Sequence, residues 1–96
     1  MKYYYMGQLV RTSNNIYKYG LLRDGKIISC SKGREGLERE LRKQVKQYEK
    51  DIAFCQDPKN AAMIKEAFKK EPAEMIAEHR ATIAGLQIVE LEKKEG

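Results

Sequence analysis

The 96-residue sequence predicts an α+β fold, in which a three-stranded antiparallel meander packs against a long amphipathic helix. Three observations predict it. Residues with high strand propensity surround an Asp-Gly turn in the first third of the chain. An apolar stripe at helical spacing follows, and two prolines then divide the remainder into shorter helical segments. The length fits a single domain over residues 1–96, with the sheet in 2–31 and helices in about 35–84.

Three segments of the first third are expected to be strands because they are rich in tyrosine and apolar residues: 2–11, 16–22 and 27–31. The second and third are joined by Asp24-Gly25, a dipeptide that supplies the two positive-φ residues of a type I′ hairpin turn. A two-residue turn fixes the strand register. The predicted opposite pairs are Arg23 with Lys26, Leu21 with Ile28, and Tyr19 with Cys30.

Because side chains alternate between the faces of a strand, this register predicts which face of the sheet is buried. The expected core face consists of Tyr17, Tyr19, Leu21, Ile28 and Cys30. The other face, which includes Leu22, is expected to be a mixed surface.

The next segment has apolar residues at steps of three and four over five helical turns, namely Leu37, Leu41, Val45, Tyr48, Ile52 and Cys55. This spacing predicts one long helix with an apolar stripe. A stripe of this length exceeds what a small sheet covers, so part of it is a candidate protein interface. The interface residues we predict are Leu37, Leu41, Val45, Tyr48 and Ile52.

Two shorter helices are predicted after the long one. Asp57 is a good N-cap and Pro58 suits the first helical position, so a helix is expected from about Pro58 to Lys70. Its expected inward residues are Ala61, Ile64 and Phe68. A third helix follows Pro72, with Ile76, His79 and Ile83 on one side and Gly85 as its C-terminal cap. Residues 86–92 are either a fourth strand or two more helical turns, and their β-branched content favours a strand.

No motif in the sequence supports catalysis, and we do not expect this protein to be an enzyme. The single histidine, His79, lies on a helical apolar stripe, and neither Cys30 nor Cys55 has a flanking motif of a nucleophile. Two isolated cysteines and one histidine do not make a zinc pattern. No phosphate-binding or nucleophile-elbow motif occurs. We therefore predict no catalytic residue, no cofactor and no metal.

The compartment is predicted from what the sequence lacks. Residues 1–7 have no apolar stretch of signal-peptide length, and no segment approaches the length of a membrane span. Two cysteines fit free thiols in a reducing compartment. We expect a cytoplasmic protein that does not bind membranes.

Charge is concentrated at the start of the chain, where residues 1–34 hold seven basic residues against one acidic residue. A basic, tyrosine-bearing sheet has the residue types for phosphate contact and base stacking. The residues predicted to bind an anionic partner are Arg11, Lys18, Arg23, Lys26, Lys32, Arg34 and Tyr4.

The predicted order of elements resembles the sheet-plus-helix DNA-binding module at the front of many integrative-element recombinases, which lay such a sheet into the major groove. The resemblance covers residues 3–50 and is carried by Arg23-Asp24-Gly25-Lys26 and by the helix after Gly36. It implies nucleic-acid binding through the sheet.

The function we predict is binding without catalysis, through contact with a partner protein or with a second copy in a homodimer. Small domains of this style are typical of accessory and inhibitor proteins of phages and mobile elements. Met6, Met63 and Met75 would suit an adaptable contact surface. The alternatives are nucleic-acid binding through the basic sheet and sequestration of a small anionic nucleotide, which would use the same residues.

Overall fold

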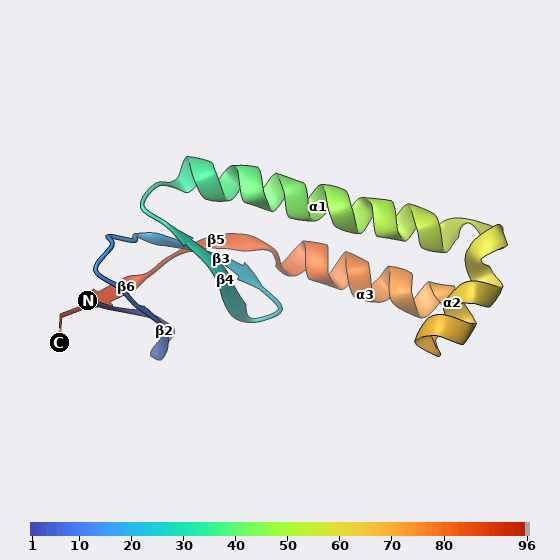
Figure 1. Ribbon diagram of the computed structural model, residues 1–96, viewed down its shortest axis with the longest axis horizontal. Coiled ribbons are helices and arrows are strands. Elements are labelled where there is room, and N and C mark those ends of the chain that lie inside the picture. Colours follow the sequence, from blue (N-terminus) through green and yellow to red (C-terminus); the bar gives the residue numbers. More distant parts are fainter. Residues whose placement is uncertain (96) are drawn as a thin grey trace. The chain divides into compact units, whose positions relative to one another are not determined.

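The computed structural model describes residues 1–95 and shows an α+β fold, as predicted (Figure 1). By contact density the chain divides into two compact units: a sheet unit, Met1–Leu41 with the segment from Gly85 onward, and a helical unit, Arg42–Ala84. The elements in chain order are β1 (Lys2–Tyr5), β2 (Gln8–Thr12), β3 (Tyr19–Arg23), β4 (Lys26–Ser31), α1 (Arg34–Gln56), a 3₁₀ turn (Pro58–Asn60), α2 (Ala61–Phe68), α3 (Pro72–Gly85), β5 (Gln87–Glu90) and β6 (Glu92–Lys94).

The strands form two small antiparallel sheets, with the orders β2-β1-β6 and β4-β3-β5. The predicted fourth strand exists as β5, and it pairs with β3. The predicted first strand, 2–11, is instead a hairpin, because Met6 and Gly7 adopt φ values of +50° and +79° and reverse the chain. Two residues with positive φ make the type I′ turn that suits the twist of paired strands. The single meander expected over residues 2–31 is therefore replaced by two sheets.

The hairpin of β3 and β4 confirms the predicted turn and corrects the predicted register. Asp24 and Gly25 have φ values of +51° and +77°, and Arg23 lies opposite Lys26. One pair further on, a bulge adds a residue to β4, so that Leu21 faces Ser29. The predicted pairs of Leu21 with Ile28 and of Tyr19 with Cys30 are wrong for this reason.

The core of the sheet unit is centred on β3, which lies between β4 and β5. Leu21 and Leu22 are both buried, although they point to opposite faces of the strand. The prediction that Leu22 lies on a mixed surface is wrong, and Ile28, predicted to be in the core, is 37% exposed. The other buried hydrophobic residues of this unit are Tyr3, Leu37 and Leu86.

Residues 16–18 lie before β3 rather than in it, so the predicted strand 16–22 begins three residues late. Backbone hydrogen bonds nevertheless hold Lys18 in place. Its N–H donates to the carbonyl of Ser31 at 2.9 Å, and its carbonyl accepts the N–H of Leu91 at 2.9 Å. The connector, residues 16–18, is therefore hydrogen-bonded both to the end of β4 and to Leu91, which lies between β5 and β6.

The helices follow the predicted boundaries closely. Asp57 caps the 3₁₀ turn, since its Oδ1 accepts the N–H of Lys59 at 3.0 Å, and Pro58 occupies the first position as expected. α2 ends at Phe68, two residues earlier than predicted, because Lys69 takes a left-handed conformation with φ +56°. Ile64 is buried as predicted. Phe68 was predicted to point inward and is instead 53% exposed.

Within residues 1–95, none of the helices is both long enough and apolar enough to cross a membrane.

Candidate functional site

The apolar stripe of α1 is the predicted protein interface, and much of it faces the interior. Leu37 and Ile52 are buried, and Leu41, Val45 and Tyr48 are half-buried. The burial of Leu37 and Ile52 leaves these two side chains little area for a partner, whereas Leu41, Val45 and Tyr48 keep part of their surface in water, and the interface on this stripe stays a prediction.

The helical unit holds an apolar hollow of about 430 Å³ where its three helices meet. Its lining comes from the last turns of α1, from α2 and from α3: Asp51, Phe54, Cys55, Ile64, Phe68, Met75 and His79. Cys55 and Ile64 are buried and form the base of the hollow. Phe54 and Phe68 are 42% and 53% exposed, so two aromatic rings meet both the hollow and the solvent.

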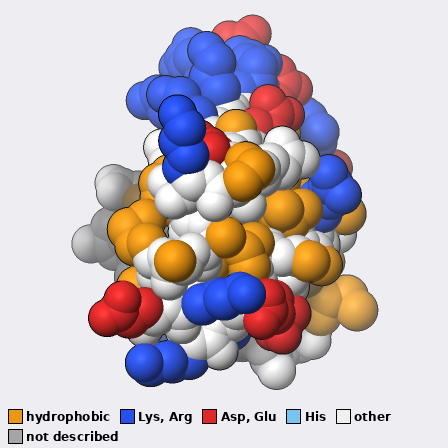
Figure 2. All heavy atoms as spheres, turned by 90° about the vertical axis from the view of Figure 1, so that its right-hand side faces the viewer, with side chains coloured by type: hydrophobic (Ala, Val, Ile, Leu, Met, Phe, Trp, Pro, Cys, Tyr) orange, Lys and Arg blue, Asp and Glu red, His pale blue; other side chains and the backbone are white. Residues whose placement is uncertain are grey.

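A further exposed apolar side chain lies on α2 outside the lining of the hollow. Met63 on α2 is among the exposed large hydrophobic residues of the chain. Figure 2 shows the face that includes the α2 end, and hydrophobic side chains gather in its centre while Lys and Arg side chains gather above them.

Two polar groups line the same hollow. The carboxylate of Asp51 accepts a hydrogen bond from the side-chain amide of Gln47 at 3.1 Å. The ring of His79 packs against Tyr48, with 5.5 Å between the ring centroids and 45° between the planes. The ring contact and the hydrogen bond limit how His79 and Asp51 can move, so both are held as polar groups beside an apolar surface.

Phe54 and Phe68 were not predicted as site residues, whereas Met75 was expected to suit an adaptable contact surface. Phe54 lies one position before Cys55, beside the main stripe of α1 rather than on it, and that offset is the only sequence signal of its exposure. Phe68 follows the spacing of a buried residue. It is exposed because α2 ends there, which only the left-handed Lys69 decides.

The predicted anion-binding residues lie in several places on the sheet unit. Lys18 and Arg34 come together over the ring of Tyr19, at 5.6 and 5.5 Å from its centroid. Arg34 also pairs with Glu38 at 3.8 Å. Lys32 is exposed in the link that precedes α1. This corner holds three of the six predicted cations.

The other members of the predicted set have separate surroundings. The Arg11 guanidinium lies 5.3 Å from the centroid of the Tyr17 ring and donates to the Tyr17 hydroxyl at 3.3 Å. Arg23 and Lys26 face each other beside the hairpin turn. Tyr4 lies beneath Lys94, with 4.9 Å between the ammonium nitrogen and the ring centroid.

The hydroxyl of Tyr17 has a shifted pKa in this arrangement. A hydrogen bond from the amide of Asn15 lowers its pKa from the ordinary value, with burial opposing the change and Ser13 and Arg11 adding to it. The Arg11 guanidinium and the Asn15 amide both donate to this hydroxyl, and both therefore favour its phenolate form.

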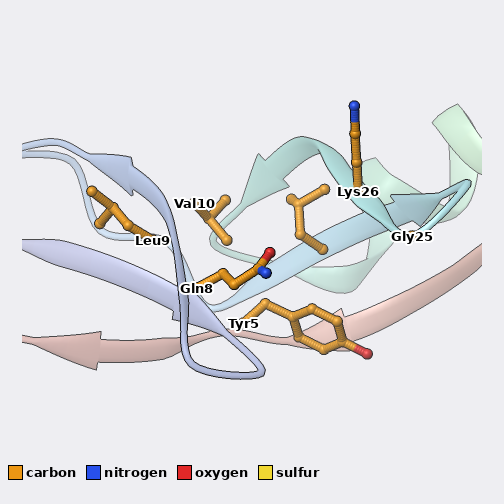
Figure 3. A pocket seen from close by; sticks show the side chains of 7 residues that line it. Tyr5, Gln8, Leu9, Val10, Gly25 and Lys26 are labelled. Carbon is orange, nitrogen blue, oxygen red and sulfur yellow. The ribbon is translucent and has the colours of Figure 1, made fainter.

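A second hollow, of about 180 Å³, lies between the two hairpins of the sheet unit. Figure 3 shows Gln8, Leu9 and Val10 of β2 on one side of it and Gly25 and Lys26 of the other hairpin across from them, with Tyr5 below. This hollow is smaller than the one in the helical unit and has more polar surface. It suits water or a short polar group better than a large apolar side chain.

No group of three or more His, Cys, Asp or Glu side chains in residues 1–95 is placed to hold a metal ion. Cys30 is half-buried, Cys55 is buried, and both are free thiols. Burial raises the pKa of the Cys30 thiol, and the nearby charge of Arg11 partly offsets the effect.

Comparison with known proteins found no relative: no family model matches the chain, and neither a curated protein nor a solved structure matches it significantly.

Proposed function

We propose that this chain is a non-catalytic protein-binding module that receives an apolar side chain of its partner in the hollow of the helical unit. The observation that carries the proposal is the pair of half-exposed rings, Phe54 and Phe68, beside a hollow of about 430 Å³ with a buried apolar base. We place the protein in the cytoplasm, where its two free cysteines would remain reduced.

The energetic argument rests on the apolar surface that remains in water. Each Å² of apolar surface removed from water is worth roughly 25 cal/mol, so covering two aromatic rings contributes several kcal/mol to association. Aromatic residues are enriched at the energetic centres of protein interfaces. Met63 lies on α2 with Phe68, and Met75 of α3 lines the hollow; their flexible side chains allow the surface to adapt to a partner.

The lining also indicates which kind of partner fits. Phe54, Cys55, Ile64, Phe68 and Met75 contribute apolar surface, and no Lys or Arg lines the hollow to anchor a small anion. An amphipathic helix places large apolar residues at positions i, i+3, i+4 and i+7, and one of them would enter the hollow. A Lys or Arg on the flank of that helix would reach Asp51. A second copy of this chain, in a homodimer, is the special case in which the partner is the protein itself.

The proposal is tested by selecting from a displayed library of helical peptides on the immobilised protein. We expect enriched peptides with apolar anchors at helical spacing, and we expect Phe68→Asp to abolish their binding. Met6→Asp is the matched control, because Met6 is 84% exposed on the sheet unit. The proposal is overturned if no peptide is enriched, or if enriched peptides bind the Phe68→Asp variant as well as the wild type.

A second candidate function is supported by the corner formed by Lys18, Tyr19 and Arg34. Two cations beside one ring could contact phosphates of a nucleic acid or of a nucleotide while the ring stacks on a base. Replacing Lys18 and Arg34 with Glu should then abolish binding of a short single-stranded oligonucleotide in a salt-dependent way. Binding that survives this double replacement would rule out the corner.

A further inference from the structure

α1 carries a row of basic residues in its helical-unit portion, and this row belongs neither to the hollow nor to the sheet. The row consists of Arg42, Lys43, Lys46 and Lys50, all of them exposed. At 100° per residue the four positions fall within an arc of about 100°, and they extend over about 12 Å of helix axis. Figure 2 shows Lys and Arg side chains gathered at the top of the view, with Asp and Glu side chains among them.

The row has no ion-pair partner in the described part of the chain. None of the four side chains forms an ion pair within residues 1–95. Asp51 lies about 80° beyond the edge of this arc, and its carboxylate accepts a hydrogen bond from Gln47. Glu49 lies just outside the arc and is exposed, and it makes no ion pair with the row. The row is thus a local concentration of positive charge on one rigid element.

Helix stability does not explain the row. Arg42 with Lys46, and Lys46 with Lys50, are like charges at i and i+4, an arrangement that destabilises a helix, whereas the opposite charges at helical spacing are Glu38, four residues before Arg42, and Glu49, three residues after Lys46. Alternating Glu and Lys at the same positions would keep the surface equally soluble and would stabilise α1. Four exposed basic residues within one arc of α1, between Glu38 and Glu49, therefore point to a ligand of the opposite sign.

We propose that the α1 row, Arg42, Lys43, Lys46 and Lys50, binds the phosphate backbone of a double-stranded nucleic acid without reading its sequence. Charges four residues apart on a helix are about 6 Å apart along its axis, which allows a straight helix to follow a line of phosphates. No aromatic residue lies between Arg42 and Lys50 on this arc, so the row has no ring on which an unpaired base could stack. The chemistry thus favours a duplex over a single strand.

This inference uses other residues than the proposed protein binding, although Phe54 follows Lys50 by four residues and therefore lies on the same side of α1. The two are separable by experiment, because Phe68→Asp should leave nucleic-acid binding unchanged, and changes in the row should leave peptide binding unchanged.

The test measures fluorescence anisotropy of a labelled 20-base-pair DNA duplex, an RNA duplex and a single strand across a series of salt concentrations. We expect both duplexes to bind more tightly than the single strand. With four phosphate contacts the affinity should fall about a hundredfold between 50 and 200 mM salt. The variant Lys43→Glu with Lys46→Glu should lose at least about tenfold in affinity at low salt. The variant Lys43→Gln with Lys46→Gln should show a smaller loss and a shallower salt dependence, and circular dichroism checks that both variants keep their helices.

The matched control is Lys59→Glu with Lys93→Glu, which changes the net charge by the same amount at two exposed lysines outside the row. Little loss in this control, together with the loss in the row variant, supports the proposal. Equal losses would mean that net charge alone attracts the duplex, and this result would overturn it. So would a wild-type protein that binds no duplex at low salt, tighter binding of the single strand, or a loss confined to Lys18→Glu with Arg34→Glu.

Discussion

The hydroxyl of Tyr3 accepts the backbone N–H of Tyr17 at 3.0 Å and donates to the carbonyl of Asn15 at 2.7 Å. The two tyrosine rings also meet edge to face, with 5.4 Å between their centroids. Tyr3 is fully buried, so its hydroxyl satisfies two backbone groups of the connector that would otherwise lose contact with water. One side chain of β1 thus holds the segment that leads into β3.

Removing this hydroxyl should destabilise the fold without changing its shape. Tyr3→Phe leaves the N–H of Tyr17 and the carbonyl of Asn15 without their partner, and we expect a loss of about 1–3 kcal/mol in the free energy of unfolding. Urea denaturation followed by circular dichroism measures it. Tyr5→Phe is the control, since Tyr5 is half-buried on the same strand. Equal stability of Tyr3→Phe and the wild type would contradict the importance of the bridge.

Gly20 on β3 has no room for a side chain. A Cβ atom at this position would lie 2.9 Å from Cγ2 of Ile27 and 3.1 Å from Cδ2 of Leu91. We expect Gly20→Ala to lower the free energy of unfolding by about 1–3 kcal/mol, because the new methyl group overpacks this part of the core. The control is Gly33→Ala, where a Cβ atom would meet nothing within 4 Å. Thermal unfolding of the two variants should separate them, and a similar Tm for both would show that β3 can shift.

Truncating Ile27 should partly restore the stability of the Gly20→Ala variant. In Gly20→Ala combined with Ile27→Ala, the two Ile27 atoms within 3.2 Å of the new methyl group are gone, and only Cδ2 of Leu91 remains close to it. The double variant should therefore be less destabilised than the sum of the two single variants. Strict additivity would show that Ile27 is not the source of the strain.

Met6 is in the left-handed region at the first position of the β1–β2 turn, with φ +50°. A side chain with a Cβ atom is strained there, and asparagine tolerates the conformation better than methionine. Met6→Asn should raise the free energy of unfolding by about 0.5–1 kcal/mol. Gly7→Ala should lower it, because Gly7 has φ +79°. Calorimetric melts of the two variants should move in opposite directions, and a shift in the same direction would be inconsistent with this turn.

Cys30 should react slowly with alkylating reagents near neutral pH. Burial raises the pKa of its thiol above the ordinary value of about 8.5, so less thiolate is present at pH 8 than in a free cysteine. In a Cys55→Ala background, the rate of iodoacetamide modification should rise with a midpoint above that of a free thiol. Arg11→Gln should move the midpoint higher, because the charge of Arg11 favours the thiolate. A midpoint at or below the ordinary value would contradict the effect of burial.

The same shift has a consequence for stability. In the unfolded chain the Cys30 thiol ionises at its ordinary pKa, whereas in the folded protein it keeps its proton to higher pH. The stability that this thiol contributes is complete below the unfolded pKa and is lost as the pH rises through the folded pKa. Comparing the pH dependence of urea midpoints for Cys30→Ala and the wild type above pH 8 measures this contribution.

Local chemistry explains what the sequence predicted correctly. The α1 stripe, the Asp57 cap with Pro58, the start of α3 at Pro72 and the Asp24-Gly25 turn each depend on a few neighbouring residues, so they are readable without the fold. Helix periodicity and turn conformations are local properties of the chain.

Tertiary structure decided which strands pair with one another and which faces of the helices and strands remain in water. The bulge in β4 and the hairpin at Met6 depend on which strands pair, and strand pairing is a non-local choice. Leu22 is buried because β3 became a central strand, and Phe68 is exposed because α2 stops beside it. The hollow at Phe54 and Phe68 is formed by three helices together, so no single stretch of sequence could reveal it.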